Sequence, residues 1–192
     1  MRLILQRVAK ASVIVDGATV ASIDRGLLCL LGFSSADTGA AAQEHLAWLA
    51  SKVLAARLWP SLDGKPWAAS CKSLGLPILL VSQFTLHGSL KKPKPDFHRS
   101  LTTEAARALW GDAIRVFEAA HGKGRVQVGV FGAMMEVALV NDGPVTLTLD
   151  SFNRGDALYE DALLQGKGED GQGDGGGSSS GGAGAGGGSG EG

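Results

Sequence analysis

Apolar and polar residues alternate over several short segments of this chain, which is the pattern of strands with one buried face. The segments predicted to be strands on this basis lie at residues 3–8, 12–15, 18–23, 126–130, 135–140 and 145–149. Asp16-Gly17 separates two of them and favours a tight hairpin turn. Two other runs, residues 26–33 and 77–83, are mostly apolar, and their length predicts strands buried on both faces.

Two longer segments repeat apolar residues at the helical spacing instead. The first predicts a helix that Asp37 or Thr38 caps and that ends near Leu58. The second predicts a helix that Thr103 caps and that Gly122 ends. Strand pairs with two main helices imply a sheet-based α/β domain in which the helices pack outside.

The composition changes sharply near the C-terminus. Residues 166–192 contain 15 of the 29 glycines, and such a segment cannot bury enough apolar surface to offset the entropy of ordering it. We therefore expect a globular domain over residues 1–151, an extension over 152–165 with a weak helical pattern, and a disordered Gly/Ser-rich tail over 166–192. Residues 1–165 carry 17 Lys and Arg against 15 Asp and Glu, a formal charge of +2. Binding to nucleic acid would therefore require a local basic patch.

Neither the cysteines nor the four histidines suggest a metal centre. Cys29 and Cys71 form no CxxC pair, and Cys29 lies in an apolar run that fits a core residue in a reducing compartment. We expect no metal and no cofactor, because the histidines form neither an HExxH motif nor a Cys/His cluster. With no long apolar stretch and no signal or transit peptide pattern, we expect no membrane span and take the cytoplasm as the default location.

Polar side chains follow the second buried run at its C-terminal end, where Ser82, Gln83 and Thr85 flank Phe84. Residues at the end of a buried strand are well placed for chemistry, although a single hydroxyl there more often bonds to the backbone. A second unusual segment, residues 141–146, has the sequence Asn-Asp-Gly-Pro-Val-Thr and separates the last two predicted strands. Because proline cannot donate to a strand ladder, this segment is either a plain turn or a backbone device whose carbonyls face a ligand.

A basic stretch begins directly after the Ser-Gln-Phe-Thr-Leu segment. Its members within thirteen positions are His87, Lys91, Lys92, Lys94, His98 and Arg99. Such a stretch is either a solvated face or a loop that contacts phosphates, which would position a nucleic acid without reading its sequence.

Together, Ser82-Gln83-Phe84-Thr85-Leu86 and Asn141–Thr146 resemble the two signature motifs of the D-aminoacyl-tRNA deacylase family, also called D-tyrosyl-tRNA deacylases. The likeness extends to the first strands, to residues 25–32, to the eukaryotic-type Lys94-Pro95-Asp96-Phe97-His98 and to Phe131–Met135, so that it covers residues 1–151. The resemblance implies a layered α/β/β fold with two β-sheets and two main helices packed outside.

The resemblance also implies an activity: hydrolysis of the ester bond of D-aminoacyl-tRNA, and of mischarged glycyl-tRNA, as a proofreading step for translation. Ser82, Gln83, Phe84 and Thr85 would form the catalytic segment, in which main-chain N–H groups around Phe84 and Thr85 bind the carbonyl oxygen. The ribose hydroxyl of the terminal adenosine would assist the attacking water. Thr85 acting as a nucleophile remains the competing mechanism.

The remaining site residues implied by the resemblance bind substrate or tRNA. Phe131, Gly132, Ala133 and Met135 would cradle the terminal adenine, although a plain bend between strands is the alternative there. Gly143 and Pro144, joined by a cis bond, would enter the active site of the other subunit of a C₂ homodimer, with Asn141 beside them and Arg7 holding their orientation. Lys91, Lys92 and Lys94 would contact phosphates of the aminoacylated tRNA.

Two other functions are compatible with parts of the sequence. One is a non-catalytic nucleic-acid-binding protein that uses the loop over residues 91–99. The other is an esterase or peptidase-like hydrolase that acts through Ser82 or Thr85.

Overall fold

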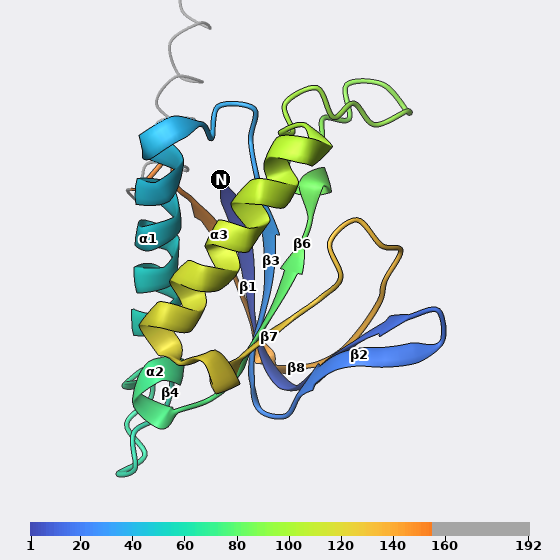
Figure 1. Cartoon of the computed structure of the whole chain (residues 1–192). Coiled ribbons are helices and arrows are strands. Elements are labelled where there is room, and N and C mark those ends of the chain that lie inside the picture. Colours follow the sequence, from blue (N-terminus) through green and yellow to red (C-terminus); the bar gives the residue numbers. More distant parts are fainter. Residues whose placement is uncertain (155–192) are drawn as a thin grey trace, which may run out of the picture. The chain divides into compact units, whose positions relative to one another are not determined.

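The computed structural model describes residues 1–154, whose elements are labelled in Figure 1. The strands are β1 (Arg2–Val15), β2 (Ala18–Ile23), β3 (Gly26–Gly32), β4 (Arg57–Trp59), β5 (Ala69–Ser70), β6 (Ile78–Ser82), β7 (Val126–Val128) and β8 (Glu136–Asp150). The helices are α1 (Gly39–Ala55), α2 (Cys71–Leu74) and α3 (Thr103–His121), with 3₁₀ turns η1 (Phe84–His87) and η2 (Lys123–Arg125). From residue 155 onward, the predicted extension and tail lie outside the described residues.

Strand β1 organises the main sheet, because its two halves pair with different strands along one edge. Residues 2–8 lie antiparallel to β3, whereas residues 11–15 lie antiparallel to β2. β6 and β7 continue from β3 in parallel, and parallel neighbours require crossovers, which here contain α1 and α3. β8 pairs with both halves of β1 along its other edge, so the sheet bends into two layers that share β1 and β8.

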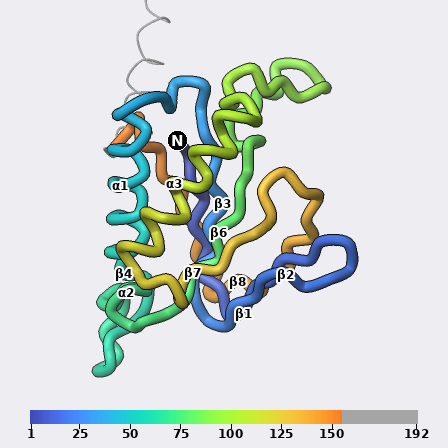
Figure 2. Tube along the Cα trace, viewed as in Figure 1, coloured from blue at the N-terminus to red at the C-terminus, as the bar shows by residue number. Residues whose placement is uncertain are grey.

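The alternation of side chains along β3 and β6 fills two separate cores. Leu27, Cys29 and Leu31 face α1 and α3, which cover one side of the sheet (Figure 1). Leu28 and its neighbours on β6 face the other way and pack against β2 and the second half of β1. The hairpin of β1 and β2 lies on the side away from α1 (Figure 2). This arrangement of helices and two sheet layers confirms the predicted α/β/β fold, and it confirms Cys29 as a core residue.

The first helix has the N-cap residue that was predicted as one of two alternatives, whereas the second begins one residue earlier than predicted. Thr38 occupies the N-cap of α1 and Thr102 that of α3, but neither side chain makes a capping bond, and Thr103 is the first residue of α3. α1 also ends at Ala55 rather than near Leu58, because the next residues pair with β5 as strand β4.

The carboxylate of Asp37 is buried and serves another purpose. It accepts bonds from the N-terminal ammonium of Met1 at 3.0 Å and from the Ser34 N–H at 2.7 Å, and His45 Nδ1 lies 2.8 Å away. Met1 also donates to Ser151 Oγ at 2.7 Å. This polar cluster ties the start of β1 to the segment before α1, and burial lowers the pKa of the Met1 ammonium.

Residues 141–146 do not form a turn between two strands, because both flanking segments belong to the single strand β8. The pairing with β1 passes directly from Val8–Asn141 to Arg7–Val145, which leaves Asp142, Gly143 and Pro144 as a bulge. Bulges bend a strand and increase its twist. This bulge lies at the corner where β8 passes from one sheet layer to the other, which explains why two strands were predicted instead of one.

Candidate active site

A cavity of about 570 Å³ opens where the buried strand β6 ends. Ser82, Gln83 and Phe84 line one part of it, and residues 131–135, between β7 and β8, line another. The beginning of α3 completes the lining, through Thr103 and Ala106 among others. The fold therefore brings together seven of the predicted site residues from two segments that are far apart in the sequence. These seven are Ser82, Gln83, Phe84, Phe131, Gly132, Ala133 and Met135.

The η1 turn at the edge of this cavity offers main-chain donors. The first N–H groups of a helical turn have no acceptor within the turn. Within residues 1–154, no hydrogen bond is found from the N–H of Phe84 or of Thr85. The Gln83 side-chain amide donates to Thr85 Oγ1, and the Phe84 ring is 57% exposed. Two N–H groups are thus free to bind an oxyanion beside the cavity.

His87 is the histidine nearest in sequence to Thr85, but it does not face the Thr85 hydroxyl. Its Nε2 donates to the Gly32 carbonyl oxygen at 3.2 Å, and the side chain is buried. Burial lowers the pKa of His87, so the imidazole is neutral at pH 7. Among residues 1–154, no histidine hydrogen-bonds to Ser82 or Thr85, so no hydroxyl–imidazole pair is formed there.

The bulge at Gly143-Pro144 forms a second cluster of predicted site residues. Arg7 Nε donates to the Asp142 carbonyl at 3.1 Å and forms an ion pair with its carboxylate at 3.2 Å. Asn141 closes the bulge, because its Oδ1 accepts from the Val145 N–H at 3.2 Å. The Gly143–Pro144 bond is cis, as predicted from the sequence. Gly143 and Pro144 are exposed, and neither lines the cavity of its own chain.

Glycine is required at position 143 by both conformation and space. Its φ is +124°, which side-chain-bearing residues rarely adopt. A Cβ atom there would lie 2.9 Å from Val145 Cγ2 and 3.0 Å from Arg7 Nη2. Arg7 therefore packs directly against the main chain of the bulge.

The basic loop, defined as residues 90–95, projects next to η1. The main-chain groups of Ser89 and Asp96 pair in both directions, at 2.8 and 2.9 Å, and close the loop at its base. Lys91, Lys92 and Lys94 are exposed in it, and none forms an ion pair within the part of the chain that the structure describes. The loop therefore presents three uncompensated positive charges.

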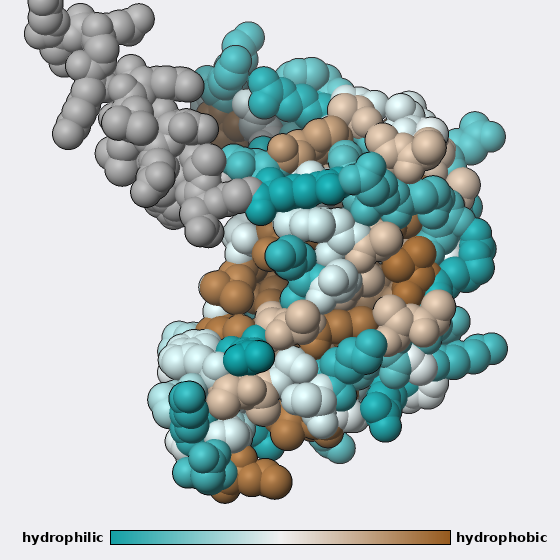
Figure 3. Space-filling view, turned by 90° about the vertical axis from the view of Figure 1, so that its left-hand side faces the viewer, coloured by the Kyte–Doolittle hydropathy of each residue, from teal (hydrophilic) through white to brown (hydrophobic). Residues whose placement is uncertain are grey.

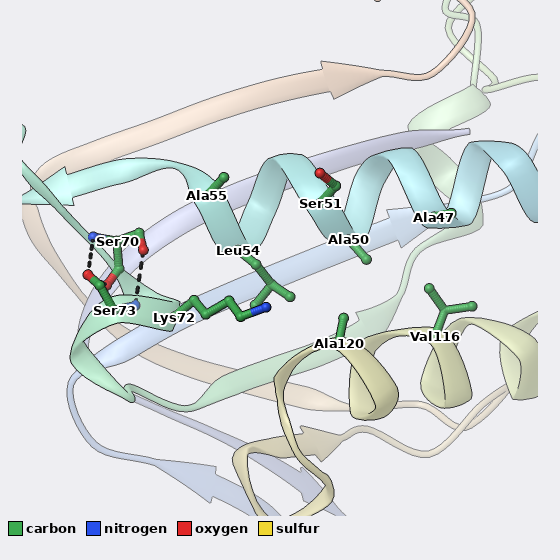
Figure 4. A pocket seen from close by; sticks show the side chains of 10 residues that line it. All are labelled: Ala47, Ala50, Ser51, Leu54, Ala55, Ser70, Lys72, Ser73, Val116 and Ala120. Atoms are coloured by element: carbon green, nitrogen blue, oxygen red, sulfur yellow. Dashed lines mark hydrogen bonds between the residues drawn. The ribbon is translucent and has the colours of Figure 1, made fainter.

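A second cavity of about 570 Å³ lies between α1, α2 and α3. Figure 3 shows the side of the molecule that carries α1, on which apolar side chains gather between polar ones. In Figure 4 small residues, alanines and serines, make up most of the cavity lining, and Lys72 extends along it. Ser70 and Ser73 bond to each other in a capping box. None of the predicted site residues lines this cavity, and the hydroxyl groups of Ser70 and Ser73 are already paired.

Residues 1–154 contain neither a candidate metal site nor a candidate membrane-spanning helix. No three His, Cys, Asp or Glu side chains gather where they could hold a metal ion. No helix in this part of the chain has both the length and the apolar character that crossing a lipid bilayer requires.

Comparison with known proteins points to one family. A family model described as D-Tyr-tRNA(Tyr) deacylase matches residues 4–150. The chain is 44% identical over 156 residues to a D-aminoacyl-tRNA deacylase of Yarrowia lipolytica, covering 80% of this chain and 99% of that protein. It is 39% identical over 157 residues to D-aminoacyl-tRNA deacylase 1 of Homo sapiens, covering 82% and 73% of the two chains. Among solved structures, the c-Myc DNA unwinding element binding protein is similar, with a TM-score of 0.73, 39% identity, and coverage of 78% and 98%.

Proposed function

Because the chain belongs to the D-Tyr-tRNA(Tyr) deacylase family, we propose that it hydrolyses the ester bond of D-aminoacyl-tRNA and releases a D-amino acid and free tRNA. The observation that carries this proposal is the cavity in which Ser82–Phe84 meet residues 131–135. The reaction removes D-amino acids before they reach translation, and the same site would also remove glycine from mischarged tRNA.

The chemistry requires little from side chains, since an aminoacyl ester is already reactive. The protein must position the ester, hold a water and stabilise the developing oxyanion. The free N–H groups of Phe84 and Thr85 bind the oxyanion, and residues 131–135 bind the terminal adenine. The ribose 2′-hydroxyl of that adenosine assists the attack by water. This mechanism agrees with the finding that no histidine among residues 1–154 hydrogen-bonds to Thr85.

Discrimination between D and L esters is assigned to Gly143 and Pro144. A side-chain pocket would also select among D-amino acids, whereas rigid main chain leaves no room for an L side chain and holds the α-amino group through carbonyl oxygens. A D side chain then points to solvent. Glycine has no side chain to exclude, which is why glycyl-tRNA would also be a substrate.

These two residues act in the cavity of a second copy, in a C₂ dimer. Three observations support this part of the proposal. Gly143 and Pro144 are exposed and lie outside their own cavity. Within residues 1–154, β8 pairs only with β1, so its outer edge is free. Exposed apolar side chains lie along it, at Leu139, Val140 and Leu147. A free edge with apolar side chains is a surface that another chain can cover.

The basic loop contacts the tRNA. Lys91, Lys92 and Lys94 form no ion pair with an acidic residue among residues 1–154, so they are available to phosphates. Such contacts fix the position of the acceptor end but do not read sequence.

The test is ester loss from D-Tyr-tRNA and L-Tyr-tRNA at substoichiometric enzyme. We expect multiple turnovers with the D ester and almost none with the L ester. Thr85→Pro, which removes one main-chain donor, should abolish turnover and exclude a contaminating hydrolase. Lys72→Ala, in the second cavity, is the matched control and should behave as wild type. Retained tRNA binding without turnover would overturn the proposal and favour a non-catalytic binding protein.

A further inference from the structure

The basic loop and the η1 turn are joined by one aromatic contact. The Ser89–Asp96 pair closes the loop, and Phe97 is the next residue of the chain. The rings of Phe97 and Phe84 meet edge to face, with centroids 5.0 Å apart and planes at 69°. Since Phe84 lines the cavity, a displacement of the loop base can reach the cavity wall through this pair of rings.

One edge of the Phe97 ring packs closely against the main chain that follows η1. Gly88 follows η1, and a Cβ atom there would lie only 2.9 Å from Phe97 Cε1. The Gly88 N–H in turn donates to the Thr85 carbonyl at 2.9 Å. Phe97 therefore packs on the main chain that ends the turn as well as on the ring that begins it.

Ser100 fixes the peptide group between Phe84 and Thr85. Its Oγ donates to the Phe84 carbonyl oxygen at 3.0 Å. In a trans peptide the C=O and the following N–H point in opposite directions, so this bond also sets the direction of the Thr85 N–H. Ser100 is itself held by its bridge to Ser34 and by the neighbouring Leu101 N–H, which donates to Phe33 O at 3.0 Å.

We propose that Phe97 and Ser100 are positioning residues for ester hydrolysis. Ser100 orients the Thr85 N–H, and Phe97 couples the η1 turn to the basic loop, so that phosphate binding at the loop raises the rate of the chemical step as well as affinity. The inference rests on the proposed deacylase activity of the same cavity. It predicts that the enzyme reacts faster with a whole tRNA than with an ester that carries no phosphates, even when both are saturating.

The experiment compares two substrates in single-turnover kinetics: D-Tyr-tRNA and the D-tyrosyl ester of adenosine, which cannot reach the basic loop. Ser100→Ala should lower the saturating rate about tenfold on both, because a misdirected donor no longer meets the oxyanion. Its KM for tRNA should stay within about twofold. Ser100→Thr keeps the hydroxyl and should restore the rate. Ser89→Ala is the matched control, because the loop-closing bonds of Ser89 are made by its main chain.

Phe97→Ala should remove the rate advantage of tRNA over the adenosine ester, whereas Phe97→Tyr, which keeps the ring, should retain it. Thermal unfolding checks that each variant is folded. If Ser100→Ala is unfolded, Ser100→Cys is measured in its place. Variants that change only the KM for tRNA would overturn the inference, as would a wild type without a rate advantage for tRNA. A wild type that hydrolyses neither ester would instead overturn the proposed function, so the two failures are distinguishable.

Discussion

The Thr85 hydroxyl accepts a hydrogen bond from the Gln83 amide, and no histidine among residues 1–154 bonds to it. If main-chain groups and the RNA hydroxyl perform the reaction, Thr85→Ala should reduce kcat by no more than about tenfold, roughly 1.4 kcal/mol of barrier. Replacing the 2′-hydroxyl of the terminal adenosine with hydrogen should be the more damaging change. Both are measured as single-turnover rates with D-Tyr-tRNA.

The competing mechanism makes the opposite prediction. A nucleophilic Thr85 would lose about a thousandfold or more on truncation to alanine. Such a loss, with unchanged unfolding temperature and unchanged tRNA affinity, would rule out the RNA-assisted mechanism. Thr85→Ser provides the control, because it keeps the hydroxyl and should remain active under either mechanism.

His87 makes the stability of the fold depend on pH. Burial is the main cause that lowers the pKa of His87 in the folded state, and the charges of Arg2 and the Met1 ammonium lower it further. The bond to Gly32 and the charge of Asp37 raise the pKa and offset part of this shift. The unfolded chain therefore binds a proton first as the pH falls through about 6.5. The contribution of His87 is fully present above that pH and decreases below it.

We expect His87→Gln to have a flatter stability profile than the wild type between about pH 7.5 and pH 5. Urea unfolding at several pH values measures the difference directly. Equal slopes for the two proteins would show that His87 is not the group responsible. His98→Gln is the matched control, since His98 is exposed and, among residues 1–154, its side chain bonds only to Asp96.

At the scale of elements, residue patterns predicted the strands and helices well where burial alone decides them. β3 and β6 are buried on both faces, and their apolar runs predict this directly. The single strand β8 was not predictable in the same way, because its bulge depends on the register with β1. Thr38 lies at the predicted N-cap position of α1 but its side chain makes no capping bond, and Asp37, the other predicted cap, bonds to Met1 and Ser34 instead.

The candidate site likewise contains some residues that the sequence predicts and others that depend on distant contacts. Polarity at the end of β6 marks Ser82–Thr85 without any structure, but only the family resemblance connected this segment with residues 131–135. Phe97 was noted only as part of the eukaryotic-type Lys94–His98 stretch, and Ser100 gave no signal. A phenylalanine and a serine acquire a positioning role only when the chain returns to η1. The periodicity of apolar residues indicates which face of a helix or strand is buried. It does not indicate which distant element packs against that face.

The basic loop is the element that a charge change can test in isolation. Replacing Lys91, Lys92 and Lys94 by alanine should weaken tRNA binding and reduce the slope of log affinity against log salt by roughly 2 to 3. The ratio of D to L turnover should stay the same, because phosphate contacts position the substrate without specifying it. Filter binding across a salt series measures the first two quantities.

A control for this prediction removes equal charge elsewhere. Alanines at Lys65, Lys72 and Lys123, which lie outside the basic loop, should leave both affinity and salt slope close to wild type. If the loop variant behaves like this control, the loop is only a solvated face and tRNA is bound by another surface.

At the scale of the whole molecule, the bend of the sheet separates the two halves of the proposed site. The bulge that lets β8 pass between layers carries Gly143 and Pro144 at an exposed corner, and the cavity lies elsewhere in the same chain. A monomer therefore holds a complete set of site residues in two places. A C₂ dimer would bring the cavity of each copy to the bulge of the other.

Mixed dimers test this directly. Thr85→Pro removes a main-chain donor from the cavity. Gly143→Ala disturbs the bulge, because its Cβ would contact Val145 and Arg7. We expect each variant alone to be nearly inactive towards D-Tyr-tRNA. After unfolding and refolding together, half of the dimers would contain one site with both parts intact, which predicts about a quarter of wild-type turnover.

Gly124→Ala is the matched control for the glycine change, since a Cβ at Gly124 meets nothing within 4 Å, and it should be fully active alone. Activity can be recovered on mixing only if one site combines the cavity of one chain with the bulge of the other. Recovery therefore requires both a dimer and a bulge that enters the partner's cavity. If each site were built from a single chain, a mixed dimer would contain two defective sites, and mixing would restore nothing. Sedimentation of the same samples reports the oligomeric state independently. A monomer with full D-ester turnover would exclude this assembly.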